Sequence, residues 1–228
     1  MSSNARARQI IAIDGPAASG KSSVARELAR KLGFAYVNSG AMYRAATWFV
    51  LNRGVDLNDA MKIAGLVESA HIECDLRNFE SRIRIDGIDS AAHLRHESVN
   101  NGVSLVSSVP RVREILVEKM RGYVRDGDVV MEGRDIGSVV FPETPFKFYI
   151  DASPQIRSQR RAAQGQTDRI AARDRADSSR RASPLTIAAD ARVIDSSHLS
   201  IDGVVAEIIE RLKEKGFQHR TRDHSAIE

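Results

Sequence analysis

The sequence predicts an α/β fold of three layers, in which a central parallel sheet is covered by helices on both faces. Short apolar runs alternate with amphipathic helical patterns along most of the 228 residues, which is typical of a parallel sheet with helical crossovers. The first apolar run leads directly into a glycine-rich turn, so a ligand is expected at the carboxyl ends of the strands. The composition, 42% hydrophobic and 28% charged, is typical of one globular core.

The glycine-rich turn is a complete phosphate-loop motif. Residues 15–22 read GPAASGKS, which matches G-x-x-x-x-G-K-[ST] and follows a predicted strand at 9–14 whose apolar run is 9–13. In such a loop the backbone N–H groups point at phosphate oxygens, Lys21 supplies a positive charge to the outer phosphates, and Ser22 offers a hydroxyl to Mg²⁺. The motif predicts a P-loop fold whose triphosphate site comprises Gly15, Pro16, Ala17, Ala18, Ser19, Gly20, Lys21, Ser22 and Ser23.

The other core elements follow the loop in chain order. A helix over 22–32 would point its positive dipole end at the phosphates. Further strands are predicted at 35–38, 128–132, 146–151 and 192–195, and further helices at 40–52, 110–124 and 201–215. In the helix over 110–124, Pro110 suits the first turn, and one apolar face is formed by Val112, Ile115, Leu116, Met120 and Val124.

Residues 56–105 depart from this alternation. A helix over 58–70 precedes two runs, 72–74 and 82–87, whose pattern is typical of exposed antiparallel strands. We expect an inserted lobe here, within a single domain whose core comprises 9–55, 106–156 and 185–216. The ends, 1–8 and 217–228, are expected to be loose and to carry no function.

Composition excludes several classes of protein. No apolar run approaches the ~20 residues that a membrane helix needs, and the single cysteine, Cys74, cannot form an internal disulfide, so a cytoplasmic protein without a membrane partner is expected. The net charge is +4, with eight arginines between 157 and 181 but only 5% aromatic residues. This cluster favours compact phosphates over nucleic acid, although a solvated helix face with acidic partners is the alternative. The six histidines form no paired metal-ligand pattern.

Absent motifs narrow the kinds of P-loop protein. The N-K-x-D sequence that a GTPase uses for guanine does not occur. The apolar strand over 128–132 ends in Glu132 and is followed by Gly133, Arg134 and Asp135, rather than by the acidic pair of a motor ATPase. These residues are better suited to contact a ligand, and a solvent-exposed turn with a salt bridge is the alternative.

Three separate segments predict a second anion pocket opposite the phosphate loop. Ser39 and Arg44 follow the second strand; taken alone, Ser39 is better explained as an ordinary helix N-cap. The second segment is 132–135. The third, 173–181, places Arg173, Asp177 and Arg180 on one helix face. Together these segments would line a pocket with arginines from distant parts of the chain.

These segments closely resemble the bacterial cytidylate kinase family. The resemblance runs from about residue 9 to 216 and rests on the phosphate loop, SGAMYR at 39–44, PRVR at 110–113, GRDIGSVVFP at 133–142 and the segment 173–185. It implies that Mg²⁺-dependent transfer of the γ-phosphoryl group of ATP to CMP or dCMP gives ADP and CDP or dCDP. It also implies that residues 56–105 are an enlarged monophosphate-binding insert, that 157–181 form a short lid, and that small nucleotides are the partners of a monomer.

The same resemblance implies roles for individual residues. Lys21, Arg134 and Arg173 would be catalytic, and Ser22 would contact the metal. Arg44, Arg134 and Arg173 would hold the CMP phosphate, Asp177 the ribose hydroxyls, and Arg160 and Arg161 the ATP side. The CMP site would comprise Ser39, Arg44, Ser104, Arg113, Arg134, Asp135, Arg173, Asp177 and Arg180, with Ser104, Arg113, Asp135 and Arg180 around cytosine.

Two other functions remain open from the sequence. One is another small-molecule P-loop kinase, for UMP, shikimate or a coenzyme precursor, which the cytosine-side residues disfavour. The other is a nucleic-acid-binding ATPase that uses the basic segment 157–181.

Overall fold

A computed structural model describes residues 8–163, 170–180 and 185–218, the side chains of 170–173 excepted. The expected loose ends therefore lie outside the described residues, apart from Arg8, Phe217 and Gln218, as do parts of the predicted lid. No helix in the described ranges is long and apolar enough to cross a bilayer.

An eight-stranded sheet forms the centre of the molecule, in the order β3-β4-β2-β6-β1-β7-β8, with β5 paired to β4. All pairings among β1, β2, β6, β7 and β8 are parallel. The strands are β1 (Ile10–Asp14), β2 (Ala35–Asn38), β3 (Ile72–Arg77), β4 (Glu80–Ile85), β5 (Ile88–Asp89), β6 (Val129–Gly133), β7 (Phe146–Asp151) and β8 (Arg192–Asp195). The predicted core strands are all present, within one residue at either end.

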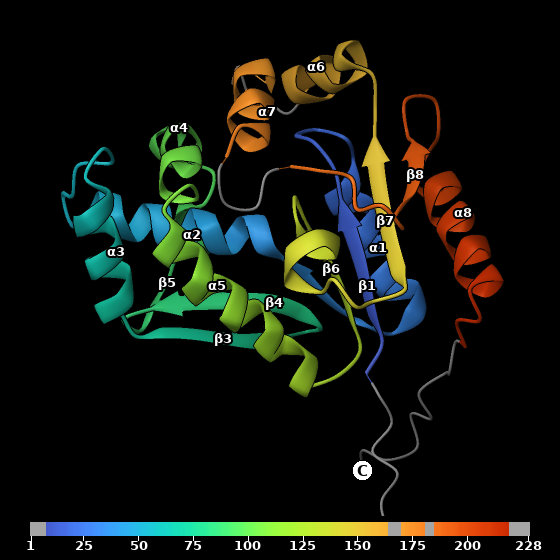
Figure 1. The fold of residues 1–228 in the computed structure, drawn as a ribbon, viewed down its shortest axis with the longest axis horizontal. Helices are drawn as coiled ribbons and strands as arrows, with labels where there is room; N and C mark the ends of the chain where they lie inside the picture. Colours follow the sequence, from blue (N-terminus) through green and yellow to red (C-terminus); the bar gives the residue numbers. More distant parts are fainter. Residues whose placement is uncertain (1–7, 164–169, 181–184, 219–228) are drawn as a thin grey trace, which may run out of the picture.

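Helices cover both faces of the sheet, so the predicted three-layer α/β class is confirmed (Figure 1). Alternate residues of β1 divide between the two cores: Ile11 and Ile13 pack under the first helix and the last, and Ala12 faces the other layer. One layer is α1 (Lys21–Leu32) with α8 (Ile201–Glu214); the other is α2 (Ser39–Asn52), α3 (Ala60–Ser69), α4 (Glu97–Val106) and α5 (Pro110–Gly122). As predicted, Pro110 is in the first turn of α5, and Val112, Leu116 and Met120 are buried.

The segment 56–105, predicted as an inserted lobe, contributes strands to the central sheet. Its β3–β4 hairpin is antiparallel, as expected, but β4 also pairs in parallel with β2, with Glu80 opposite Tyr36. The hairpin therefore extends the central sheet. The segment also contains α4, a helix that the sequence pattern did not indicate.

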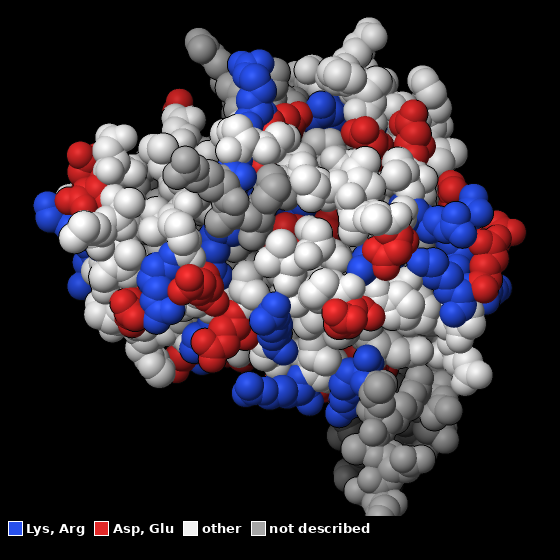
Figure 2. All heavy atoms as spheres, viewed as in Figure 1, with Lys and Arg blue, Asp and Glu red and all other residues white. Residues whose placement is uncertain are grey.

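The carboxyl ends of the parallel strands all lie on one side of the molecule. There α6 (Pro154–Ala163) and α7 (Ile170–Ser178) lie above the strand ends (Figure 1). A short π-helical turn, η3 (Ile136–Val140), follows β6 close by. On the face drawn in Figure 2, positive and negative side chains are interspersed over the described residues, so that face lacks the one-sign stripe typical of nucleic-acid binding.

Candidate active site

The phosphate loop connects β1 to α1 and is shaped by close packing. A Cβ at Gly15 would lie 2.1 Å from the carbonyl oxygen of Ile150 on β7, so only glycine lets the chain leave the sheet there. Lys21, the first residue of α1, is buried, and its Nζ donates to the Pro16 carbonyl at 2.9 Å. The ammonium group is thus held across the loop, beside the N–H groups at the start of the helix.

Glu132, at the end of β6, joins the phosphate loop to the second strand–helix connection. Its buried carboxylate accepts a hydrogen bond from Ser22 Oγ at 2.8 Å, and its backbone carbonyl accepts one from Ser39 Oγ at 2.8 Å. Sequence reasoning gave Glu132 no role of its own. The sequence did hold a signal for such a role, because Glu132 is an acidic residue that directly follows the apolar strand residues 129–131.

The interpretation of Ser39 as an N-cap is wrong, because Asn38 occupies that position. The Asn38 side chain accepts from the Ala41 N–H at 2.9 Å, and Ser39 is already the first helical residue of α2. Asparagine is as good a cap as serine, so either residue fitted the pattern. The Ser39 hydroxyl instead donates its hydrogen bond to the Glu132 carbonyl on β6.

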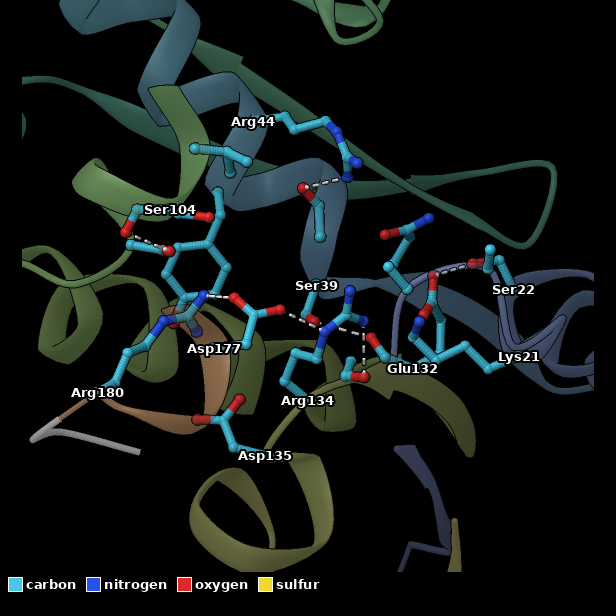
Figure 3. Close-up of a pocket in the computed structure, with 18 of the residues that line it drawn as sticks. Lys21, Ser22, Ser39, Arg44, Ser104, Glu132, Arg134, Asp135, Asp177 and Arg180 are labelled. Atoms are coloured by element: carbon cyan, nitrogen blue, oxygen red, sulfur yellow. Dashed lines mark hydrogen bonds and ion pairs between the residues drawn. The ribbon is translucent and has the colours of Figure 1, made fainter. Parts of the chain in front are cut away.

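The phosphate loop and the second set of predicted residues line one cavity of about 150 Å³ (Figure 3). Its loop side includes Lys21 and Ser22. The predicted residues on the remaining walls are Ser39, Arg44, Ser104, Arg113, Arg134, Asp135, Arg161, Asp177 and Arg180. The elements that contribute them are α2, α4, α5, the turn after β6, α6 and the end of α7, which are far apart in the sequence.

Buried ion pairs organise the wall opposite the loop. Asp135 and Arg113 are 4% and 3% exposed and form an ion pair, and Arg113 Nη1 also donates to the Ser107 carbonyl at 3.1 Å. The Arg113 guanidinium lies 5.2 Å from the centre of the Tyr43 ring. Because Asp135 is buried, the alternative of a solvent-exposed turn at this position is wrong.

A second carboxylate, Asp177, is held between two arginines. Its Oδ2 accepts from Arg134 Nε at 2.8 Å, and its Oδ1 accepts from Arg180. We call Arg113, Arg134, Asp135, Asp177 and Arg180 the arginine–aspartate cluster. Within the described residues, the Nε groups of Arg113 and Arg180 are buried without a hydrogen-bond partner, a cost that a polar ligand could relieve. Burial lowers the pKa of Arg180, which adds to this cost.

Helices α6 and α7 contact the phosphate loop. Arg160, on α6, donates to the Ser19 carbonyl at 3.2 Å and to the Ser196 carbonyl at 2.6 Å, and it does not line the cavity. Asp174, on α7, accepts from the Ala17 N–H at 3.4 Å and pairs with Arg157. The backbone of Arg173 lies in α7, but its side chain is outside the described part of the structure.

Several other residues predicted for the triphosphate site, in the loop and the first turn of α1, do not line the cavity: Gly15, Pro16, Ser19, Gly20 and Ser23. Among the described residues there is no group of three or more His, Cys, Asp or Glu side chains that could hold a metal ion. At the start of α1, the Ser22 hydroxyl and the Glu132 carboxylate bring oxygen atoms together, 2.8 Å apart.

Comparison with known proteins shows which family the chain resembles. A family profile described as "Cytidylate kinase" matches residues 11–214. A cytidylate kinase of Pelotomaculum thermopropionicum is 44% identical and covers 89% of this chain and 95% of its own length; one of Nocardia farcinica is 43% identical, with coverages of 87% and 91%. Among solved structures, a gluconokinase from Sinorhizobium meliloti 1021 has a TM-score of 0.47 and 13% identity, covering 93% of this chain and 97% of its own.

Proposed function

The chain belongs to the cytidylate kinase family, which makes it an ATP-dependent kinase of CMP or dCMP, and we propose that the transfer takes place in the cavity between the phosphate loop and the arginine–aspartate cluster. The products are ADP and CDP or dCDP. The observation that carries the proposal is that one cavity is lined both by Lys21 and Ser22 and by arginines from five other segments.

The chemistry requires charge neutralisation rather than a base. The attacking oxygen belongs to the CMP phosphate, which is already ionised, so positioning and electrostatic stabilisation supply most of the catalysis. We assign Lys21 to the transferring phosphoryl group and Arg44, Arg134 and Arg173 to the CMP phosphate. Arg134 suits this role because it lines the cavity and its guanidinium is held by two contacts, Nε to Asp177 at 2.8 Å and Nη1 to the Gly133 carbonyl at 3.5 Å.

The cluster also supplies groups for the nucleoside. Asp135 Oδ2 accepts from Arg113, and we assign Oδ1 to the 4-amino group of cytosine. Arg113 would donate to the N3 and O2 side, with Ser104 and Arg180 alongside and Ser39 nearby. We assign Asp177 to the ribose hydroxyls. Uracil carries a carbonyl where cytosine carries the amino group, so the Asp135 carboxylate would repel it.

The residues beside the phosphate loop fit Mg²⁺ arriving with ATP. The ion prefers oxygen ligands and commonly binds through one or two protein groups together with substrate phosphates, and Ser22 Oγ and the Glu132 carboxylate lie 2.8 Å apart. Ser22, with Glu132 behind it, would hold the ion. The bound ion supplies positive charge to the phosphates.

We further assign 56–105 to the monophosphate-binding region and 157–181 to a lid, and we propose a cytoplasmic monomer that binds nucleotides and no nucleic acid. Closure of the lid over both substrates would exclude water and prevent hydrolysis of ATP. Arg160 and Arg161 belong to the ATP side in this scheme. The elution volume and light scattering of the purified protein test the monomer.

A coupled assay of ADP formation tests the function. CMP, dCMP, UMP, AMP and shikimate are supplied separately with ATP and Mg²⁺, and CMP and dCMP are expected to give the highest kcat/KM. Turnover with UMP or shikimate above that with CMP would assign the chain another substrate. RNA-stimulated hydrolysis of ATP without CMP turnover would contradict the proposal altogether.

A further inference from the structure

Asp14 is a buried carboxylate that the mechanism above does not use. It is the last residue of β1, it immediately precedes Gly15 of the phosphate loop, and it is 6% exposed. Its two oxygens accept the backbone N–H groups of Ile136 and Gly137, each at 2.8 Å. These two donors directly follow Asp135 and begin the η3 turn, so one side chain bridges the ATP loop and the base-reading segment.

The rest of η3 is fitted closely around this bridge. A Cβ at Gly137 would lie 3.1 Å from Lys147 Cγ and in contact with Asp14 Oδ2 at 3.4 Å, so a side chain there would press on Lys147 and fill the space beside the carboxylate. At the other end of the turn, Arg121 donates to the carbonyls of Val139 and Val140, each at 3.0 Å. The turn is thus held by a carboxylate at its N–H end and by a guanidinium at its carbonyl end.

A charged group in this place is costly, which indicates a specific requirement. Burial raises the pKa of Asp14 from 3.8 to about 7, against the opposing effect of its two backbone hydrogen bonds. Asp135 adds repulsion and Lys21 adds attraction. An apolar side chain would avoid the desolvation cost but would leave two buried N–H groups without acceptors. Only a carboxylate can accept from both.

We propose that Asp14 is a positioning residue that sets the place of Arg134 and Asp135 relative to the phosphate loop and thereby determines the preference for CMP over UMP. The proposal rests on the assignment of Asp135 to cytosine. Asp14 fixes the backbone of Ile136 and Gly137 and so the Asp135 carboxylate beside them, while the phosphate loop keeps its own supports in Arg157, Arg160 and Asp174.

The test compares Asp14→Asn with wild type. Asparagine offers one carbonyl acceptor, and its amide N–H group would face the second backbone donor. We expect KM for CMP to rise and the CMP-to-UMP ratio of kcat/KM to fall by about 10-fold. This loss is smaller than the ~100-fold that a full 1 Å misplacement can cost, because one of the two hydrogen bonds is retained. KM for ATP should stay within about two-fold of wild type, because the loop keeps its other contacts.

Asp128→Asn is the matched control. Asp128 also accepts a backbone N–H, that of Gln9 at 2.8 Å, but at the opposite edge of the sheet; its substitution should leave the CMP-to-UMP ratio unchanged. Arg121→Gln loosens the far end of η3 and should lower the ratio in the same direction by a smaller factor, which keeps the proposal testable if Asp14→Asn fails to fold.

Asp135→Asn in the same series separates the two proposals. If it lowers the ratio while folded Asp14→Asn and Arg121→Gln do not, Asp14 has no positioning role. If Asp135→Asn leaves the ratio unchanged, the assignment of Asp135 to cytosine fails instead. Equal rises in KM for ATP and CMP in Asp14→Asn would also overturn the inference, because they would indicate a general loss of structure.

Discussion

The two sides of the cavity are built on different principles. The phosphate-loop side is one stretch of eight consecutive residues that includes Lys21, and its shape depends on the close approach of Gly15 to Ile150. The arginine–aspartate side is assembled from side chains on distant segments, held by ion pairs such as Arg113–Asp135 and Arg134–Asp177. The first side is local and the second depends on the whole fold.

This difference predicts how each side responds to substitution. Backbone groups of the loop persist when a side chain is changed, so Lys21 carries most of what can be removed there. In the cluster, loss of one charge leaves its partner buried and unpaired, which can cost about 3–5 kcal/mol of stability. Effects on the cluster should therefore spread among neighbours, whereas effects on the loop should be confined to turnover.

Replacing Lys21 should have the largest effect. In Lys21→Ala, kcat is expected to fall by about 10³-fold or more, because a charge that stabilises the transferring phosphoryl group in a dry site contributes several kcal/mol. The matched control is Lys31→Ala on the same helix, where the ammonium pairs with Asp202 at the surface. Near-normal turnover by folded Lys21→Ala, measured in the coupled assay, would remove this residue from the mechanism.

The next effect concerns the base. In Asp135→Asn the CMP-to-UMP ratio of kcat/KM should fall by about 100-fold, because the carboxylate that accepts from cytosine is replaced by an amide that can donate to uracil. The ratio is measured with both nucleotides at saturating ATP, and thermal unfolding checks the fold. An unchanged ratio would mean that Asp135 serves only to hold Arg113.

Replacing Asp177 should change the CMP-to-dCMP ratio of kcat/KM, by a smaller factor than the change expected for Asp135. Asp177→Ala should lower kcat/KM for both substrates, because Arg134 and Arg180 lose their partner, and should lower it about 10-fold more for CMP than for dCMP, which lacks one hydroxyl donor. Asp174→Ala, on the same helix, should leave the CMP-to-dCMP ratio unchanged. Equal losses on both substrates in Asp177→Ala would indicate that this carboxylate does not contact the 2′ hydroxyl.

The same contrast explains what could be read from the sequence. Strands such as Ala35–Asn38 and Phe146–Asp151 were predicted at their observed ends, because apolar runs and turn residues act locally. The phosphate-loop motif lies entirely within eight consecutive residues, so it could be recognised directly from the sequence. By contrast, the bond from Asp14 to Ile136 spans 122 positions, and the pairing of β4 with β2 depends on how a hairpin docks; no short pattern encodes either.

Within the site, sequence reasoning named residues more reliably than it named their partners. The resemblance supplied Ser104 and Arg113, which do line the cavity, although their roles remain predictions. The helix that carries Ser104 was missed, because 97–106 contains Gly102, two asparagines and two serines, which are weak helix formers. Its apolar residues Val99, Val103 and Val106 are buried, and Val103 and Val106 belong to the core on this face of the sheet, so tertiary packing outweighs propensity there.

The smallest expected effect is that of replacing Arg160, and it tests whether the phosphate-loop side keeps its shape without contacts from distant segments. Its guanidinium lies behind the phosphate loop, where it donates to the carbonyls of Ser19 and Ser196. Arg160→Ala removes these bonds, but the Ser19 carbonyl keeps a second donor, Ser196 Oγ at 2.7 Å. The loop should therefore hold its shape, and KM for ATP should rise only about three-fold, the equivalent of one ordinary hydrogen bond.

The CMP side should be unaffected by Arg160→Ala, because none of these bonds reaches the arginine–aspartate cluster. Full saturation curves for ATP and for CMP, each at a fixed excess of the other, separate the two sides. Arg161→Ala is the comparison, since Arg161 lines the cavity and should raise KM for ATP more. If Arg160→Ala instead raises KM for ATP more than about 30-fold, the loss exceeds that of one hydrogen bond. Arg160 would then contact ATP directly, and ATP binding would depend on residues outside the phosphate loop.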